Sequence, residues 1–201
     1  MKNLLLAILI LPLWSSPVLA ERYLSTFGFS VDIPAHWTVM TRKELQANPD
    51  MFAFDNAAFA NTDRELLKQM ESMVRAGRIE LYFNQQTSTP GFNDNINVYR
   101  QQGRIPRNDA ELQQSCRALP AELARGFGKS IAVHDCKITN VAGLRAFYVD
   151  FDGVVNDTRS IQYQIEKSPL EVVIFTVTTQ NSTLSTNRRE FDDIVGSIRL
   201  E

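Results

Sequence analysis

Alternating apolar and polar side chains predict the strands of this chain. Residues 27–33 alternate and stop at Pro34, as expected for a strand that ends where a backbone donor is lost. Residues 172–177 are apolar on both faces, which is typical of a central strand. The same criteria predict further strands over residues 78–83, 95–99, 131–138, 144–153, 159–166 and 171–179.

Capping residues and a period of about 3.6 predict two helices in the first half of the chain. Over residues 62–76, Thr62 and Glu65 form a capping box, an apolar stripe follows, and Gly77 ends the helix. Residues 41–48 are expected to form a shorter helix.

Two more helices are predicted in the second half. One begins at Asn108, has Glu111 three residues later, and contains Pro120, where we expect a break or kink because proline cannot donate within a helix. The other closes the chain and is predicted to be capped by Asn187, with Glu190 at the third position.

The turns between the last four predicted strands are short. A parallel crossover needs a dozen or more residues, so these strands should pair antiparallel. Helices that interrupt the earlier strands must then lie across the faces of the sheet. We therefore predict an α+β fold, an αβα sandwich with a six- to seven-stranded, mainly antiparallel sheet and helices on its faces.

The first twenty residues have the order of a secretory signal peptide. Lys2 precedes an apolar run over residues 4–13, and Val18-Leu19-Ala20 predicts cleavage after Ala20. The run is short for a bilayer span, and no second long apolar stretch follows it. We expect residues 21–201 to form one exported domain, periplasmic or secreted, with no transmembrane segment after cleavage.

The two cysteines, Cys116 and Cys136, both lie in the predicted mature part. In an oxidising compartment such a pair is interpreted first as a disulfide, here joining a helix to the sheet. Closing a loop of this length should stabilise the fold by about 3 kcal/mol. The alternatives are a redox-active pair, although C-x-x-C spacing is missing, or a metal site that includes His134 and Asp135.

Charge argues against two classes of partner. The formal net charge is −2, and it becomes −3 once Lys2 is removed. Nucleic acid requires a concentrated basic surface, and anionic lipid attracts clustered Lys and Arg, so neither is an expected partner.

The sequence offers little that could support catalysis. Its two histidines, His36 and His134, are interpreted as a surface turn residue and a partly buried core residue. No nucleophile elbow, P-loop, G-x-G-x-x-G, H-E-x-x-H or C-x-x-C motif occurs. A non-enzymatic protein is the expectation, and a hydrolase centred on His134 and Asp135 is the alternative.

Asp150, Asp152 and Asp157 form the best acidic cluster in the chain. Asp150 and Asp152 share one face of a predicted strand, so they could hold a hard cation. The interpretation we favour is a solvated strand end that enters a turn.

Three segments bracket nearly the whole predicted mature chain: FSVDIPAHW at residues 29–37, FNDNINV at 92–98 and FDDIVGSI at 191–198. Together they resemble the PsbP superfamily, which includes the extrinsic PsbP subunit of photosystem II and bacterial proteins of the DcrB kind. The resemblance implies an αβα sandwich around an antiparallel sheet and a non-enzymatic accessory or binding role. Some photosynthetic relatives are linked to metals, but no metal ligand can be matched in this sequence, and no cofactor is expected.

These observations lead to one main hypothesis, an exported accessory or binding protein of the bacterial envelope. Its partner, a protein or another envelope component, is expected at the loop-rich edge over residues 85–107. Phe92, Tyr99 and Ile105 are the candidate contact residues, because apolar loop side chains are costly to expose without use. The alternative is a periplasmic protein that binds a small ligand or a metal.

Overall fold

The computed structural model describes residues 20–52, 64–87 and 92–201 of the chain. In this part the chain forms two sheets, four α-helices and one short 3₁₀ helix, η1 (Pro49–Phe52). The predicted signal peptide up to residue 19 and the capping residue Thr62 lie outside the described residues. Among the described helices, none is both long enough and apolar enough to cross a membrane.

The larger sheet has seven strands in the order β3-β4-β5-β9-β8-β7-β6, and all neighbouring strands pair antiparallel. This confirms the predicted α+β class and the predicted size of the sheet. The strand that is apolar on both faces, β9, is the middle one, also as predicted. The strands are β3 (Trp37–Met40), β4 (Glu80–Asn84), β5 (Asn95–Gln102), β6 (Val133–Val141), β7 (Leu144–Asp152), β8 (Thr158–Ser168) and β9 (Glu171–Gln180).

A second sheet has the order β1-β2-β10. Its middle strand, β2 (Phe29–Pro34), is the first strand that the alternation predicts. Its neighbours, β1 (Ala20–Ser25) and β10 (Arg199–Leu200), were not predicted, because one overlaps the expected cleavage site and the other has only two residues.

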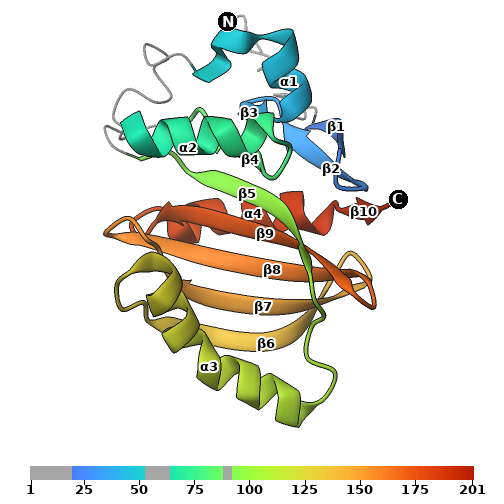
Figure 1. The fold of residues 1–201 in the computed structure, drawn as a ribbon, viewed down its shortest axis with the longest axis vertical. Coiled ribbons are helices and arrows are strands. Elements are labelled where there is room, and N and C mark those ends of the chain that lie inside the picture. The colour runs from blue at the N-terminus through green and yellow to red at the C-terminus, as the bar shows by residue number, and fades with distance from the viewer. Residues whose placement is uncertain (1–19, 53–63, 88–91) are drawn as a thin grey trace, which may run out of the picture.

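Helices and the small sheet cover the two faces of the large sheet (Figure 1). On one face lie α1 (Arg42–Ala47), α2 (Arg64–Arg75) and α3 (Asp109–Phe127), and on the other lie α4 (Leu184–Gly196) and the small sheet. The α4 face holds the largest apolar cluster, in which Phe29, Phe175 and Phe191 are buried. Each such side chain stabilises the fold by about 1.5–3 kcal/mol.

Helix α3 begins as predicted but does not break. The Asn108 side chain accepts from the Glu111 backbone N–H at 2.9 Å, and Gly128 ends the helix with φ 70°. The helix runs continuously through Pro120, so a break there is wrong, and the alternative, a kink, stays a prediction. Buried Leu119 on the sheet side and the link to the sheet at Cys116 hold the helix across the missing hydrogen bond.

That link is the predicted one between helix and sheet. Cys116 in α3 and Cys136 in β6 have their sulfur atoms 2.00 Å apart, which is disulfide distance, with 5.8 Å between the Cα atoms. The bridge fixes α3 over the edge of the large sheet, where Leu119 joins an apolar cluster with Phe147 and Val149.

Helix α4 begins earlier than predicted. Its N-cap residue is Thr183, and Asn187 lies in its first turns and not at the cap. The Asn187 side chain instead donates to the Asp94 carboxylate at 2.6 Å, a contact across 93 positions of sequence. The spacing of Asn187 and Glu190 resembles a capping box, but the Asn187 side chain binds Asp94 and does not cap the helix.

Candidate functional site

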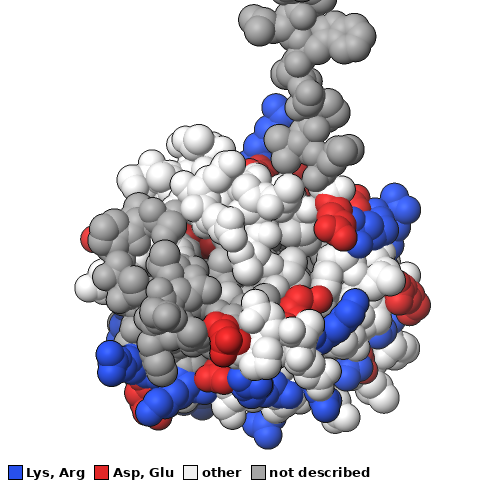
Figure 2. All heavy atoms as spheres, turned by 90° about the horizontal axis from the view of Figure 1, so that it is seen from above, with Lys and Arg blue, Asp and Glu red and all other residues white. Residues whose placement is uncertain are grey.

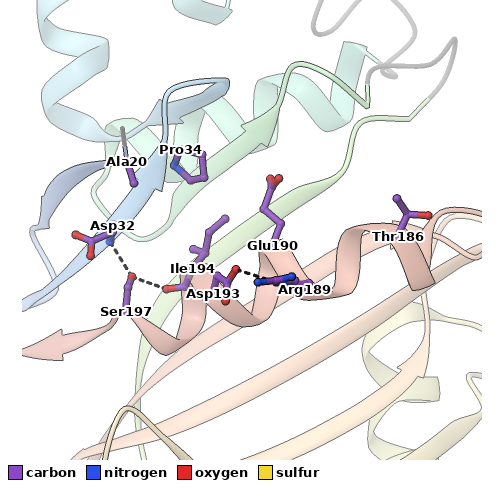
Figure 3. Close-up of a pocket in the computed structure, with 9 residues that line it drawn as sticks. All are labelled: Ala20, Asp32, Pro34, Thr186, Arg189, Glu190, Asp193, Ile194 and Ser197. Carbon is purple, nitrogen blue, oxygen red and sulfur yellow. Dashed lines mark hydrogen bonds and ion pairs between the residues drawn. The ribbon is translucent and has the colours of Figure 1, made fainter. Parts of the chain in front are cut away.

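A groove of about 420 Å³ runs between α4 and the small sheet (Figure 3). Asp32 and Ser197 close one end, where the Asp32 backbone N–H donates to the Ser197 hydroxyl at 2.8 Å. Arg22 binds the Asp32 carboxylate at 2.8 Å, and Arg189 lies 3.9 Å from Asp193. The charged side chains Asp32, Arg189 and Asp193 of the lining are therefore already paired. The lining comprises Ala20, Asp32, Pro34, Thr186, Arg189, Glu190, Asp193, Ile194 and Ser197.

Glu190 at the floor of this groove joins α4 to the large sheet. One carboxylate oxygen accepts from His36 Nε2 at 3.0 Å, from the Trp37 indole N–H, and from Asn84 Nδ2 at 3.3 Å. His36 lies in the turn before β3, as expected, but it is half-buried against this carboxylate. In this position the histidine supports the packing of α4.

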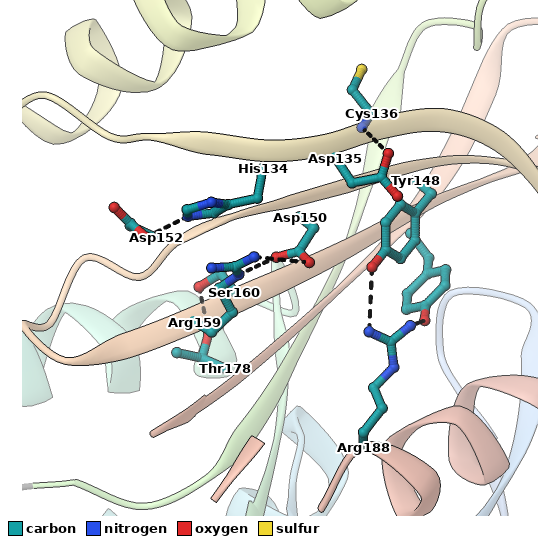
Figure 4. A network of polar contacts seen from close by, with 11 residues as sticks. His134, Asp135, Cys136, Tyr148, Asp150, Asp152, Arg159, Ser160, Thr178 and Arg188 are labelled. Carbon is teal, nitrogen blue, oxygen red and sulfur yellow. Dashed lines mark hydrogen bonds and ion pairs between the residues drawn. The ribbon is translucent and has the colours of Figure 1, made fainter. Parts of the chain in front are cut away.

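A second cavity, of about 310 Å³, lies on the same face of the large sheet, between α4 and strands β6 to β8. Its centre is a pair of tyrosines, Tyr148 and Tyr163, whose rings meet edge to face with 5.3 Å between centroids. Arg188 donates to the Tyr148 hydroxyl at 3.3 Å (Figure 4) and to the Tyr163 hydroxyl at 3.5 Å. The Tyr163 hydroxyl in turn donates to Asp192 at 3.0 Å, and Asp192 pairs with Arg188 at 3.0 Å.

Burial raises the pKa of Tyr148 and of Tyr163, so both phenols are neutral near neutral pH. Lys137 completes this cavity, with its ammonium 4.8 Å from the centre of the Tyr148 ring. The hydrogen bond to Asp135 raises the pKa of Lys137, while burial and the nearby charge of Arg188 act against that shift. Two cations, the Asp192 carboxylate and two neutral phenols therefore line one small cavity, which holds no nucleophile–base pair among its lining residues.

The predicted acidic cluster is separated into individual pairs. Asp150 is bound by Arg159 of the neighbouring strand, and Asp152 lies 2.6 Å from His134 Nε2. Asp157 is exposed in the turn between β7 and β8, with φ 59°. Among the described residues, no group of three His, Cys, Asp or Glu side chains is placed to hold a metal ion.

His134 is exposed, so its interpretation as a core residue is wrong. The register of β6 against β7 shifts between Val133 and Asp135, and this bulge removes His134 from the alternation that would have turned it inward. Nor do His134 and Asp135 form the pair that a hydrolase would use. Asp135 binds Lys137 at 2.5 Å and its own neighbour's backbone, while His134 binds Asp152 (Figure 4).

Of the three expected contact residues, Ile105 is wrong, and Tyr99 and Phe92 are only partly exposed. Ile105 has no exposed area and packs against the α3 side of the sheet. Tyr99 is half-buried between the apolar clusters beneath α2 and α3, and Phe92 is half-buried at the start of this segment. Ile105 and Tyr99 thus pack in the core, so the expectation that exposed apolar loop residues form this surface fails for Ile105.

Sequence reasoning missed the residues that line the second cavity. Two signals could have found them. The first is the spacing of Arg188 and Asp192, an i,i+4 ion pair on a helix. The second is the presence of Tyr148 and Tyr163 on neighbouring antiparallel strands, where they form a direct cross-strand pair.

Comparison with known proteins establishes the fold. The solution structure of cyanobacterial PsbP (CyanoP) from Synechocystis sp. PCC 6803 matches with a TM-score of 0.57 and 9% identity, covering 94% of this chain and 96% of that chain. The chain has the PsbP fold. The resemblance of the three sequence segments to the PsbP superfamily thus predicted the architecture correctly.

Two other solved structures match with lower TM-scores. The Ran-binding protein Mog1p from Saccharomyces cerevisiae matches with a TM-score of 0.48 and 11% identity, covering 90% of this chain and 96% of that chain. LpqN from Mycobacterium tuberculosis, involved in cell envelope biogenesis, matches with 0.44 and 9% identity, covering 93% and 87%. No family model and no curated protein matches the sequence.

Proposed function

We propose that this PsbP-fold chain is an exported, non-enzymatic accessory protein that binds a protein or another component of the bacterial envelope. The observation that carries the proposal is that the candidate catalytic and metal-binding side chains pair with other side chains of the fold. Both histidines and the candidate aspartates Asp150 and Asp152 are engaged in pairs that support the fold. An accessory role is also what the resemblance to the PsbP superfamily implies.

Two observations support export. The only cysteines of the chain lie at disulfide distance, and disulfides persist mainly in oxidising compartments. The first twenty residues also have the order of a signal peptide. We infer cleavage after Ala20, so that the mature chain begins at Glu21, the second residue of strand β1.

For the binding surface we propose the end of the sheet where α3 stops. Phe127, Val154 and Val155 are 45%, 44% and 49% exposed. The Lys129 ammonium donates to the Val154 carbonyl at 2.5 Å, which ties the end of α3 to the turn between β7 and β8. Exposed apolar side chains that lie together are typical of a contact surface.

The surface charge is compatible with a protein partner and argues against a polyanion. Basic and acidic side chains alternate along the rim of the face that Figure 2 shows. The formal net charge of −2 agrees with this mixture. Nucleic acid would require a concentrated basic surface.

The experiment has two parts. The full chain, tagged at its C-terminus and expressed in a Gram-negative host, is fractionated, and its N-terminus is sequenced. We expect periplasmic or secreted protein that begins at Glu21. An uncut chain in the cytosol would refute export.

The second part tests binding by crosslinking in intact cells. A Val154→Asp/Val155→Asp variant should lose a crosslinked envelope component that the wild type retains. Leu170→Asp is the matched control, because Leu170 is exposed in the turn between β8 and β9. Equal crosslinking by wild type and both variants would refute this surface.

A further inference from the structure

In the cavity between α4 and strands β6 to β8, Tyr148 and Arg188 have O–H and N–H groups that find no acceptor among the described residues. The Tyr148 hydroxyl accepts from Arg188 at 3.3 Å, but its own proton has no acceptor among the described residues. Tyr148 is only 5% exposed and lines this cavity, so an acceptor for its proton has to be a molecule that enters the cavity. Burying a hydroxyl without a partner costs free energy, which a bound acceptor would recover.

Arg188 adds further donors. A guanidinium has five N–H groups. In the described part of the chain, the Nε–H points to Asp192, and each terminal nitrogen makes one contact with a tyrosine oxygen. One N–H on each terminal nitrogen therefore has no partner among the described residues. Because Asp192 holds the guanidinium from the same helix, these two groups are fixed in direction.

Lys137 brings a second cation to the same ring. Its ammonium lies 4.8 Å from the Tyr148 ring centre, and the Arg188 guanidinium carbon lies 5.8 Å from that centre. Each cation is paired with a carboxylate of its own element, Asp135 in β6 and Asp192 in α4. Among the described residues no carboxylate bridges Lys137 and Arg188, so the two like charges repel each other.

We propose that this cavity binds a small oxyanion, a phosphate or carboxylate group held between Lys137, Arg188 and the Tyr148 hydroxyl. An oxyanion accepts several hydrogen bonds at once, and charge-assisted bonds to Arg and Lys are the strong ones. It would use the Tyr148 proton and the unused N–H groups, and it would relieve the repulsion between the cations. The volume of about 310 Å³ is at the lower end for ligand pockets, which favours a small molecule.

The proposal stands independently of the envelope partner, because the two sites share no residue. The test is an NMR titration of the full chain with inorganic phosphate and with succinate, at constant ionic strength. We expect saturable shifts at Lys137, Tyr148 and Arg188. A third titration, with dihexanoyl phosphatidate, distinguishes a lipid headgroup from a free phosphate or carboxylate. Binding of this compound alone identifies the oxyanion as a lipid headgroup.

Three variants make the test specific. Tyr148→Phe keeps the ring and removes the donor, and Lys137→Gln removes one charge, so each should weaken binding about tenfold. Arg189→Gln is the control, because it removes the same charge one residue further along α4 from a side chain that is 92% exposed. Shifts scattered over the surface, or equal weakening by all three variants, would overturn the proposal.

Discussion

At the scale of single residues, Glu190 attaches α4 to the large sheet through three hydrogen bonds. One of its carboxylate oxygens accepts from His36, Trp37 and Asn84, which belong to the turn before β3, to β3 and to β4. Glu190→Ala leaves three partly buried donors without their acceptor. We expect a loss of about 2 kcal/mol in the free energy of unfolding, measured by urea denaturation.

Glu122→Ala is the control for this substitution. Glu122 is exposed on α3, and loss of an exposed carboxylate should change stability by less than about 0.5 kcal/mol. If the two variants lose the same stability, the three hydrogen bonds to Glu190 do not hold the helix.

Asp94 makes stability depend on pH. Its side chain is 1% exposed, and burial raises the pKa of its carboxyl although hydrogen bonds from Thr179 and Asn187 oppose the shift. A carboxyl whose folded pKa is raised stabilises the fold fully below the unfolded pKa, near 4. That contribution is lost as pH rises through the folded pKa. Asp94→Asn should therefore lose less stability than the wild type as pH rises above about 4, in urea denaturation at a series of pH values.

Asp193→Asn provides the comparison for Asp94. The Asp193 side chain is 75% exposed, so its loss should leave the shape of the wild-type pH curve unchanged. Parallel curves for wild type and Asp94→Asn would show that burial of Asp94 does not couple folding to protons.

At the scale of elements, the bond between Cys116 and Cys136 fixes α3 to β6. The two residues are separated by 20 positions, and cross-linking a loop of that length stabilises a fold by about 3 kcal/mol. The double variant Cys116→Ser/Cys136→Ser should lose about this amount in urea denaturation. Reduced wild type should match the variant, and a reduced protein as stable as the oxidised one would contradict the prediction.

Pro120 should make α3 less stable than the same helix would be with alanine at this position. It lies inside a continuous helix and its side chain is exposed, so it contributes no buried contact to offset its missing N–H. Pro120→Ala should raise the free energy of unfolding, by about 3 kcal/mol at most, in urea denaturation. A variant that is less stable than the wild type would mean that the proline ring shapes the packing of α3.

The elements show which parts of the fold the sequence can predict. Periodicity and caps located β9, α1 and the start of α3, because those signals depend on residues a few positions apart. Asn187 was misinterpreted because its side chain binds the distant Asp94 carboxylate. His134 was misinterpreted because the bulge in β6 turns its side chain outward.

The cavity lined by Tyr148, Tyr163 and Arg188 could not be predicted from the sequence, because it also depends on contacts between distant residues. The Tyr148–Tyr163 pair exists only because β7 and β8 align in one register, and Arg188 reaches both only because α4 packs over them. Ile105 illustrates the converse, since a loop residue that looked exposed becomes core when α3 covers it.

At the scale of the whole molecule, the two sheets share one core. Phe29 of β2 and Phe175 of β9 are both fully buried, and their rings meet edge to face with 4.9 Å between centroids. Removing the Phe29 ring opens a cavity between the sheets, so Phe29→Ala should cost about 3–5 kcal/mol. Because the core is continuous, this loss should destabilise both sheets and not the small sheet alone.

Native-state hydrogen exchange distinguishes these outcomes. In the wild type, the slowest amides of β2 and β9 should exchange with the same free energy, that of global unfolding. In Phe29→Ala both sets should lose protection equally. If β2 amides lose protection while β9 amides keep theirs, the small sheet opens on its own, and the groove it forms with α4 would open with it.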